Sequence, residues 1–381
     1  MVGNKNILKK VLFVIITLGI SIPMIQHITQ FANQKELWGD VQSNTDATLM
    51  SDTWFSGDYQ DSTDLFLNDN FGFRSSFVRL HNQIQYSFYN RVQAQGVIIG
   101  KDWYLYEYNY IRSYYGLDYV GDSVLKEKTR RLKYIQNKLK LKGKQIIVVL
   151  APGKGSFFPE FFPDTSRHKK SRTNYDGYIE LFKSEQINHL DLKNWFLERK
   201  NHSEFPLYSK AGIHWSKYGE ILALDTLLSS LEVLSGSPFP EVVVDSFVLQ
   251  SYNDYGDYDI GEGMNLIFRT PTYPMAYPKF HIENSEYNTN KVLVVADSYY
   301  WGMFNQGFSD SFFNNGQFWY YNQAVYPESY KTLLLVSALN LIESVESNDV
   351  IVLLSTDANL HRFAFEFIDQ LYDAYQQKKE D

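Results

Sequence analysis

The sequence predicts an α/β fold in which a parallel sheet is flanked by helices. Branched apolar residues form three runs that are typical of buried strands, at 145–150, 292–295 and 350–354. Residues with helical spacing precede or separate these runs, over 126–141, 173–187 and 331–345. Such alternation of strands and helices is typical of a parallel sheet, which we therefore expect to form the core.

The first thirty residues predict a membrane anchor. Lys5, Lys9 and Lys10 precede an apolar run from Val11 to Ile25, and no small-residue cleavage site follows that run. We expect residues 1–30 to be an uncleaved signal anchor that forms a transmembrane helix, with the remainder of the chain on the extracytoplasmic, periplasmic side. A cleaved signal peptide is the alternative.

A juxtamembrane helical region is expected to follow the anchor, over residues 31–92. Phe77, Leu80, Ile84 and Phe88 recur there at helical spacing. The region therefore predicts at least one amphipathic helix close to the membrane.

The rest of the chain is expected to form one domain over residues 93–375. It begins with a strand or hairpin at 97–106. Residues 235–290 are rich in Gly, Pro, Tyr and Asp, which predicts an irregular insertion that covers or borders the functional site.

Composition restricts the possible function. The formal charge of −8 and pI near 5.6 argue against a nucleic-acid-binding surface. The chain has 0 cysteines, which excludes disulfides, thiolate chemistry and cysteine-ligated zinc, and we expect no cofactor. Aromatic residues make up 17% of the chain. Most of them are expected in the core, but the cluster at 318–322 is expected near the functional cleft.

A serine and a histidine are the candidates for nucleophilic chemistry. Ser298 follows the strand pattern at 292–295, and functional groups of parallel sheets lie at the carboxyl ends of strands. His214 follows Gly212 on a loop, and Ser216 is placed to cap the apolar-periodic helix after it. A serine hydroxyl needs a base within hydrogen-bond reach, so this pair predicts a nucleophile and its base.

Five segments in order resemble the alginate O-acetyltransferase family, whose members are extracytoplasmic SGNH-hydrolase-like acetyltransferases. They are residues 66–74 (FLNDNFGFR), 97–106 (VIIGKDWYLY), 146–154 (IIVVLAPGK) with 158–160, 214–215 (HW) and 297–298 (DS). The resemblance implies an SGNH-hydrolase-like fold and transfer of an acetyl group to a polysaccharide through Ser298 and His214. It also implies a membrane-bound O-acyltransferase as the partner that delivers acetyl groups.

The acid of the expected triad is missing from its usual place. The family pattern has aspartate two residues before the histidine, where this chain has Gly212. Asp357 ends the strand pattern at 350–354 and is the candidate substitute, because its strand end is expected at the same sheet edge as Ser298. Another carboxylate, or none, is the alternative. A further alternative is an Asp357–His361 pair, in which His361 replaces His214 as the base.

Four other residues are candidates for the oxyanion site or for substrate binding. Asn359 has an amide that suits an oxyanion, and Lys154 follows a strand where a cation would hold an acyl oxygen or a sugar carboxylate. Tyr299 follows Ser298, and Trp319 belongs to the aromatic cluster. Lys154 as a solvated loop residue is the alternative interpretation.

Two acidic features of the sequence are not expected to take part in the chemistry. Asp297 is expected to support the turn at Ser298 because its side chain points to the opposite side. The Asp-rich segment 253–259 lacks the spacing and closing glutamate of a calcium loop, so we expect an exposed turn and no metal site.

These observations together predict a membrane-anchored O-acetyltransferase that acts on an extracytoplasmic polysaccharide through a serine acyl-enzyme. Gly212 favours the alternative of a non-catalytic carbohydrate-binding or polysaccharide-assembly protein on the same fold. A carbohydrate acetyl esterase is a third possibility, which differs only in the access of water to the acyl-enzyme.

Overall fold

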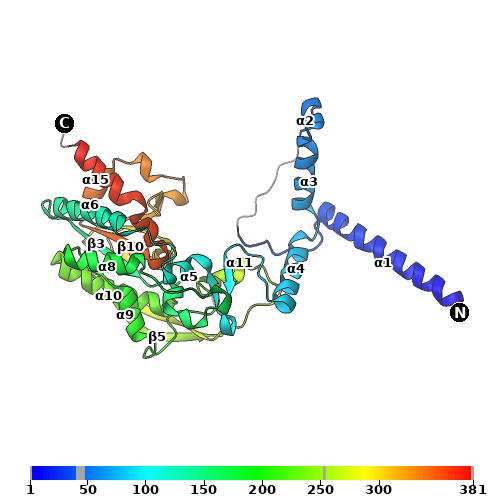
Figure 1. The fold of residues 1–381 in the computed structure, drawn as a ribbon, viewed down its shortest axis with the longest axis horizontal. Coiled ribbons are helices and arrows are strands. Elements are labelled where there is room, and N and C mark those ends of the chain that lie inside the picture. The colour runs from blue at the N-terminus through cyan, green and yellow to red at the C-terminus, as the bar shows by residue number, and fades with distance from the viewer. Residues whose placement is uncertain (1, 40–47, 252–254, 379–381) are drawn as a thin grey trace. The chain divides into compact units, whose positions relative to one another are not determined.

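The computed structural model describes residues 2–39, 48–251 and 255–378. The chain divides into two compact units, of which one comprises Met1–Gln95 with Gly261–Arg269 and the other Gly96–Ile260 with Thr270–Asp381 (Figure 1). Part of the predicted juxtamembrane region, residues 40–47, and Asn253 and Asp254 of the Asp-rich segment lie outside the described residues.

The N-terminal unit is helical. Its helices are α1 (Val2–Thr29), α2 (Ser51–Ser56), α3 (Asp58–Asn70) and α4 (Arg74–Tyr89). By length and composition, α1 is able to cross a membrane over Asn6–Thr29, a property that a signal sequence shares. The segment before α4 packs directly on α1, since a Cβ atom at Gly72 would lie 1.9 Å from the carbonyl oxygen of Pro23.

The second unit contains a six-stranded sheet with the order β4-β3-β10-β7-β8-β9. All neighbouring pairs are parallel except β8 and β9, which pair antiparallel. The sheet is made of β3 (Gln145–Ala151), β4 (His189–Leu190), β7 (Val292–Ala296), β8 (Phe318–Tyr320), β9 (Ala324–Tyr326) and β10 (Val350–Thr356). The predicted α/β fold, with its three buried strands, is confirmed.

One face of the sheet is covered by α6 (Asp122–Lys140), α8 (Asn174–Ser184) and α15 (Phe367–Gln377) (Figure 1). Alternate residues of the central strands, among them Val148, Val295 and Leu353, are buried in a core with these helices. Side chains alternate between the two faces of a strand, and the intervening residues are buried as well. The central strands are therefore apolar throughout, as parallel strands covered on both sides must be.

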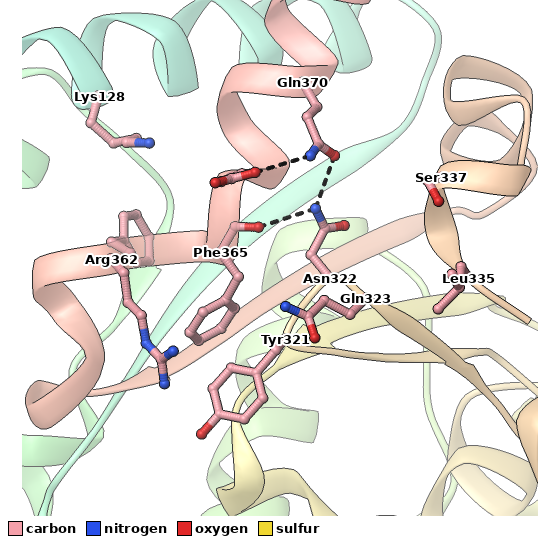
Figure 2. A pocket seen from close by; sticks show the side chains of 11 residues that line it. Lys128, Tyr321, Asn322, Gln323, Leu335, Ser337, Arg362, Phe365 and Gln370 are labelled. Atoms are coloured by element: carbon pink, nitrogen blue, oxygen red, sulfur yellow. Dashed lines mark hydrogen bonds between the residues drawn. The ribbon is translucent and has the colours of Figure 1, made fainter. Parts of the chain in front are cut away.

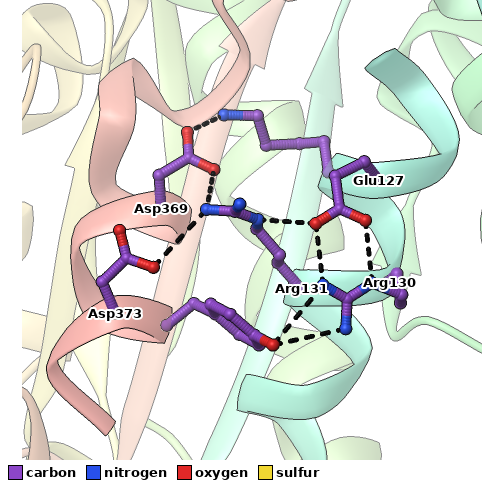
Figure 3. A network of polar contacts seen from close by, with 7 residues as sticks. Glu127, Arg130, Arg131, Asp369 and Asp373 are labelled. Carbon is purple, nitrogen blue, oxygen red and sulfur yellow. Dashed lines mark hydrogen bonds and ion pairs between the residues drawn. The ribbon is translucent and has the colours of Figure 1, made fainter. Parts of the chain in front are cut away.

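Ion pairs join two of the covering helices. Arg131 of α6 contacts Glu127 one turn earlier and also Asp369 and Asp373 of α15, at 2.9, 3.3 and 3.6 Å (Figure 3). Partly exposed pairs of this kind contribute little individually to stability, and they add to the apolar packing of α15 against α6.

Of the remaining helices of this unit, α14 packs beside α15 on the face just described, and α9 contacts β3. These remaining helices are α5 (Tyr108–Tyr115), α7 (Lys154–Phe157), α9 (Leu192–Arg199), α10 (Lys217–Ser235), α11 (Tyr255–Gly263), α12 (Trp301–Asn305), α13 (Phe308–Phe312) and α14 (Leu341–Glu346). The helix predicted over 331–345 is thus only partly formed, since its first half is a loop with a 3₁₀ turn.

Two antiparallel hairpins complete the fold. β1 (Val97–Ile99) pairs with β2 (Leu105–Glu107), as the strand pattern at 97–106 predicts. β5 (Glu241–Gln250) pairs with β6 (Met275–Glu283) inside the segment 235–290, so the expectation that this segment has irregular structure is wrong for these residues. The alternation in β5 is hard to recognise because most of its residues remain partly or fully exposed.

The strand ends that matter for function lie at one edge of the sheet. Ala151 at the end of β3 pairs with Thr356 at the end of β10, and Ala296 at the end of β7 pairs with Leu354. The turns that follow these strands therefore meet at the same edge, as expected for parallel strands.

Candidate active site

Ser298 begins a 3₁₀ turn immediately after β7. The turn is held by Asp297, which is fully buried and accepts hydrogen bonds from the backbone N–H of Tyr299 at 3.1 Å and of Thr356 at 2.8 Å. The carboxylate thus ties the end of β7 to the end of β10. It leaves the Ser298 side chain at the sheet edge, partly exposed, in agreement with the supporting role expected for Asp297.

His214 lies on a loop that ends at α10, where Ser216 accepts a hydrogen bond from the backbone N–H of Gly219 at 3.0 Å. A bridge between Tyr208 and Trp215 closes the base of the loop. The Tyr299 hydroxyl donates to the carbonyl oxygen of Ile213 at 2.7 Å, which fixes the loop against the serine turn.

The structure brings the serine and the histidine together and adds an aspartate. His214 Nε2 lies 2.9 Å from Ser298 Oγ, and His214 Nδ1 lies 2.5 Å from Asp259 Oδ2. Since a carboxylate only accepts, Nδ1 carries the proton in this arrangement and Nε2 is free to accept from the serine hydroxyl. The result is a continuous Ser–His–Asp hydrogen-bond chain.

Asp259 comes from α11, in the Asp-rich segment that was expected to be an exposed turn. Its side chain is largely buried, and its second oxygen accepts the backbone N–H of Ile213 at 2.8 Å. A Cβ atom at Gly212 would lie 2.8 Å from the backbone carbon of Asp257 and 2.9 Å from the carbonyl oxygen of Gly256. Glycine at 212 therefore makes the space in which the segment carrying Asp259 approaches the histidine.

The charges around His214 favour its protonated form. Burial disfavours the imidazolium, but the carboxylates of Asp259, Asp297 and Glu107 together raise the pKa of His214 above its ordinary value. Asp259 contributes most among them, through both its charge and its hydrogen bond. An imidazolium formed during a reaction would therefore be stabilised at this position.

Asp357 does not occupy the position expected for the acid. Its carboxylate accepts the backbone N–H of Gly153 at 3.0 Å and the hydroxyl of Ser156, and forms an ion pair with Lys193 at 3.0 Å. The prediction placed it at the correct sheet edge, but its side chain joins β10 to the turn after β3. Sequence position cannot show this, because the direction of a side chain after a strand end depends on the turn.

Asn359 is not available as an oxyanion donor. It is buried, and its amide group donates to Asp297 Oδ2 at 2.8 Å while its oxygen accepts from Arg362 at 3.0 Å. His361, the alternative base, contacts Asp118 at 3.7 Å, and its ring bonds to neither Ser298 nor Asp357.

Lys154 is not a substrate-binding or solvated loop residue, because it is completely buried. Its ammonium group donates to the carbonyl oxygens of Lys210 and Gly212 at 2.6 and 2.7 Å. Burial lowers the pKa of Lys154 to about 7, against the opposing effect of the Asp259 carboxylate. The side chain thus holds the loop that carries His214.

Tyr299 and Trp319 are also internal. Tyr299 is fully buried and its ring centre lies 5.0 Å from that of His214, so it supports the histidine rather than a ligand. Trp319 is fully buried between β8 and α15, where its ring packs on Phe367 at 6.1 Å. Side chains alternate along β8, and position 319 faces the core rather than the sheet edge.

A neighbour of Trp319 does border the site. Tyr321 donates its backbone N–H to the carbonyl oxygen of Ala296 at 2.9 Å, two residues before Ser298, and its side chain lines a cavity of about 560 Å³ (Figure 2). Figure 2 shows the Arg362 guanidinium and the Tyr321 phenol pointing to the same side of this cavity, opposite to Gln370. Arg362 stacks over the Tyr321 ring at 4.7 Å. The expectation of an aromatic cluster near the cleft therefore applies to Tyr321.

No metal centre is evident in the part of the chain that the structure describes, where no cluster of three or more His, Asp or Glu side chains is able to hold an ion. Asp257 of the Asp-rich segment is buried, and burial raises its pKa to about 7. Residues 256–259, the part of this segment whose burial the structure describes, are therefore buried or half-buried, contrary to the exposed turn that was expected.

Asp259 is the residue of this arrangement that the sequence did not identify. It lies 45 residues after His214. The available signal was indirect: a glycine in place of the usual acid, together with a later segment dense in aspartates. Spacing alone gives no reason to prefer Asp259 over Asp357.

Residues 97–239 match a family model described as the SGNH hydrolase-like domain of the acetyltransferase AlgX. No curated protein matches the chain.

Several solved structures are similar. The O-acetyltransferase domain of Pseudomonas putida AlgJ is 15% identical with a TM-score of 0.46, and the match covers 73% of this chain and 99% of that one. Pseudomonas aeruginosa AlgX is 16% identical with a TM-score of 0.44, covering 72% and 67%. Bacillus cereus PatB1 is 13% identical with a TM-score of 0.39, covering 71% and 99%.

The family model spans β1 to the end of α10 and includes His214 and its loop. This match confirms the predicted resemblance to the alginate O-acetyltransferase family, over residues 97–239.

Proposed function

We propose that this protein is an O-acetyltransferase that modifies an extracytoplasmic polysaccharide through an acetyl-serine intermediate. The observation that carries the proposal is the hydrogen-bond chain from Ser298 through His214 to Asp259, at 2.9 and 2.5 Å. The match to an acetyltransferase family model supports the choice of an acetyl group.

In the first half-reaction, Ser298 Oγ attacks the carbonyl carbon of an acetyl donor while His214 Nε2 takes the hydroxyl proton. His214 then gives this proton to the departing oxygen of the donor, and the acetyl group remains on Ser298. Asp259 holds Nδ1 and stabilises the imidazolium during both steps.

In the second half-reaction, a sugar hydroxyl replaces the serine. His214 Nε2 accepts the proton of the sugar hydroxyl as its oxygen attacks the acetyl carbonyl, and then returns the proton to Ser298 Oγ. The negative charge on the carbonyl oxygen needs hydrogen-bond donors in each half-reaction. The N–H of Ser298 is one such donor, since the first N–H of a helical turn has no partner within that turn.

We assign the acceptor sugar to the cavity beside Tyr321. Its volume of about 560 Å³ is in the range of ligand sites, and its wall combines aromatic and amide side chains that suit sugar rings and hydroxyls. Among them are Tyr321, Gln323, Phe365 and Gln370. Tyr321 connects this cavity to the strand that leads to the nucleophile, through the hydrogen bond from its N–H to the carbonyl oxygen of Ala296.

In this proposal, the N-terminal helix determines the localisation of the enzyme. As a signal anchor, α1 keeps the catalytic unit at the outer face of the membrane, where a membrane-bound O-acyltransferase is the proposed acetyl source. The non-catalytic alternative was favoured by Gly212, and Asp259 removes that reason by supplying a carboxylate from another segment.

The full chain in detergent should cleave a small activated acetyl ester, and acetylated Ser298 should be detectable by mass spectrometry in rapidly quenched samples. Ser298→Ala and His214→Ala should each remove most of this activity, because the groups act as a unit. Ser347→Ala and His281→Ala, at exposed positions, are the matched controls.

Addition of oligosaccharide acceptors distinguishes transfer from hydrolysis. A transferase should yield acetylated oligosaccharide at the expense of free acetate, whereas an esterase should release acetate at the same rate with or without acceptor. Equal inactivity of the wild type and both variants, with glycan binding retained, would establish the binding-protein alternative.

A further inference from the structure

Helix α4 exposes its apolar face and packs with its polar face. Phe77, Leu80, Ile84 and Phe88, here called the α4 stripe, are 49, 47, 41 and 80% exposed. Their spacing of three and four residues places them on one side of the helix. A single exposed apolar side chain is ordinary, but a continuous stripe of four indicates contact with an apolar environment.

The opposite side of α4 is buried within the N-terminal unit. Arg79 donates to the carbonyl oxygen of Glu36 at 2.6 Å, and Asn82 donates to the carbonyl oxygen of Met264 at 3.0 Å. Both side chains are less than one-tenth exposed. These contacts fix the rotation of the helix, so the α4 stripe cannot turn inward without breaking buried hydrogen bonds.

The position of α4 relative to α1 indicates what covers the stripe. Besides Pro23, a Cβ atom at Gly72 would meet the backbone nitrogen of His27 at 2.9 Å, and the Phe73 ring packs edge-to-face on Phe31 at 5.9 Å. The start of α4 thus lies against the last two turns of the helix that is able to span a membrane. If α1 spans, those turns are at the outer membrane surface.

Exposed aromatic residues accompany the stripe in the same unit. Trp54 and Phe55 of α2 and Phe71 before α4 are 49, 87 and 50% exposed. Aromatic side chains are enriched at the boundary between lipid headgroups and acyl chains, because their rings prefer that region. Helices that lie in this boundary combine one apolar face with one polar face.

We propose that the α4 stripe binds the lipid surface of the membrane that α1 crosses, with α4 lying in the headgroup region. The proposal rests on the anchor proposed above. It gives the protein two membrane contacts, of which α1 provides retention and α4 fixes the orientation of the N-terminal unit at the surface.

Single-cysteine labelling tests this directly, because the chain has 0 cysteines of its own. The full chain is incorporated into phosphatidylcholine nanodiscs with a fluorophore on Ile84→Cys, or on Gln85→Cys as the matched control. Gln85 is the next residue, about 100° around the helix from the stripe, and is partly exposed. Lipids brominated on their acyl chains should quench the label at 84 several-fold more than the label at 85, and aqueous acrylamide should show the reverse.

A second measurement tests the stripe as a whole. Leu80→Glu with Ile84→Glu should make a label on Phe88→Cys accessible to acrylamide, while co-elution of the protein with nanodiscs persists through α1. Val233→Glu, at an 88% exposed position on α10, should leave the label at 88 protected.

Two results would overturn the proposal and are distinguishable. Free access of acrylamide to the label at 84 in nanodisc-bound protein would exclude lipid contact and leave the stripe to a protein partner. Failure of the full chain to co-elute with nanodiscs would instead refute the anchor, and the lipid contact with it.

Discussion

At the scale of single residues, the presence of a glycine at 212 and the position of Asp259 depend on each other. A side chain at 212 would collide with the backbone of residues 256 and 257, and that backbone leads to the carboxylate that holds His214. The absence of an aspartate at 212 and the approach of Asp259 to His214 are thus two parts of one local arrangement. The same geometry predicts that a carboxylate introduced at 212 would displace α11 rather than complete a triad.

Asp259→Asn should lower the turnover of an acetyl ester by roughly 10²–10⁴-fold, because an amide does not hold the required tautomer or stabilise the imidazolium. His214 must be neutral to accept a proton, so wild-type activity should fall as the pH decreases through the raised pKa of His214. Without the Asp259 charge that pKa is lower, and the remaining activity should therefore persist to lower pH.

The measurement is a pH–rate profile of both proteins. Asp225→Asn, at an exposed position on α10, is the matched control and should keep the wild-type profile. An unchanged rate and an unchanged acidic limb for Asp259→Asn would remove Asp259 from the mechanism.

At the scale of elements, Lys154 connects α7 with the loop before α10. The ammonium group satisfies two buried carbonyl oxygens, those of Lys210 and Gly212, beneath the rings of Tyr104 and Tyr106. The carbonyl oxygen of Lys210 also accepts the N–H of Leu105 at 2.8 Å, whereas that of Gly212 relies on the Lys154 ammonium. A buried carbonyl oxygen without a donor is costly, so the loop conformation at Gly212 depends on this side chain. The geometry of His214 depends on the loop in turn.

Lys154→Met should reduce the free energy of unfolding by about 1–3 kcal/mol, because the buried carbonyl oxygen of Gly212 loses the Lys154 ammonium as its donor. The loss should grow with pH between about 7 and about 10.4. In that window the unfolded wild type binds the Lys154 proton and the folded protein, with its pKa lowered to about 7, releases it, so wild-type stability rises with pH. The methionine variant lacks this gain.

Denaturant unfolding at several pH values measures the difference, and Lys126→Met at an exposed position is the control. A pH-independent difference would show that the lysine keeps its charge in the folded protein. Ester turnover should fall together with stability if the His214 loop loosens.

At the scale of the whole molecule, the chain combines a helical unit that contains α1 with an α/β unit that contains the Ser–His–Asp chain. Three basic residues precede the apolar run of α1, and this asymmetry predicts a cytoplasmic amino terminus. The charge and hydropathy pattern therefore predicts the compartment of the second unit independently of its fold.

In intact cells stripped of any outer layer, added protease should digest the α/β unit, and the undigested protein should remain in the membrane fraction. Amino-terminal sequencing should find the chain intact at its start. A mature protein that starts beyond residue 25 would instead identify the segment as a cleaved signal peptide.

The sequence by itself predicted the three central strands of the sheet, two of the helices that cover it, and the pairing of Ser298 with His214. These features depend on local patterns: apolar runs form buried strands, a serine caps a helix, and parallel strands end at a common edge. Only the tertiary structure decided that Asp259 lies within hydrogen-bond distance of His214, and that Asp357, Asn359, Lys154, Tyr299 and Trp319 are internal supports. The direction of a side chain after a strand end depends on contacts between distant segments, and those contacts form only when the chain is folded.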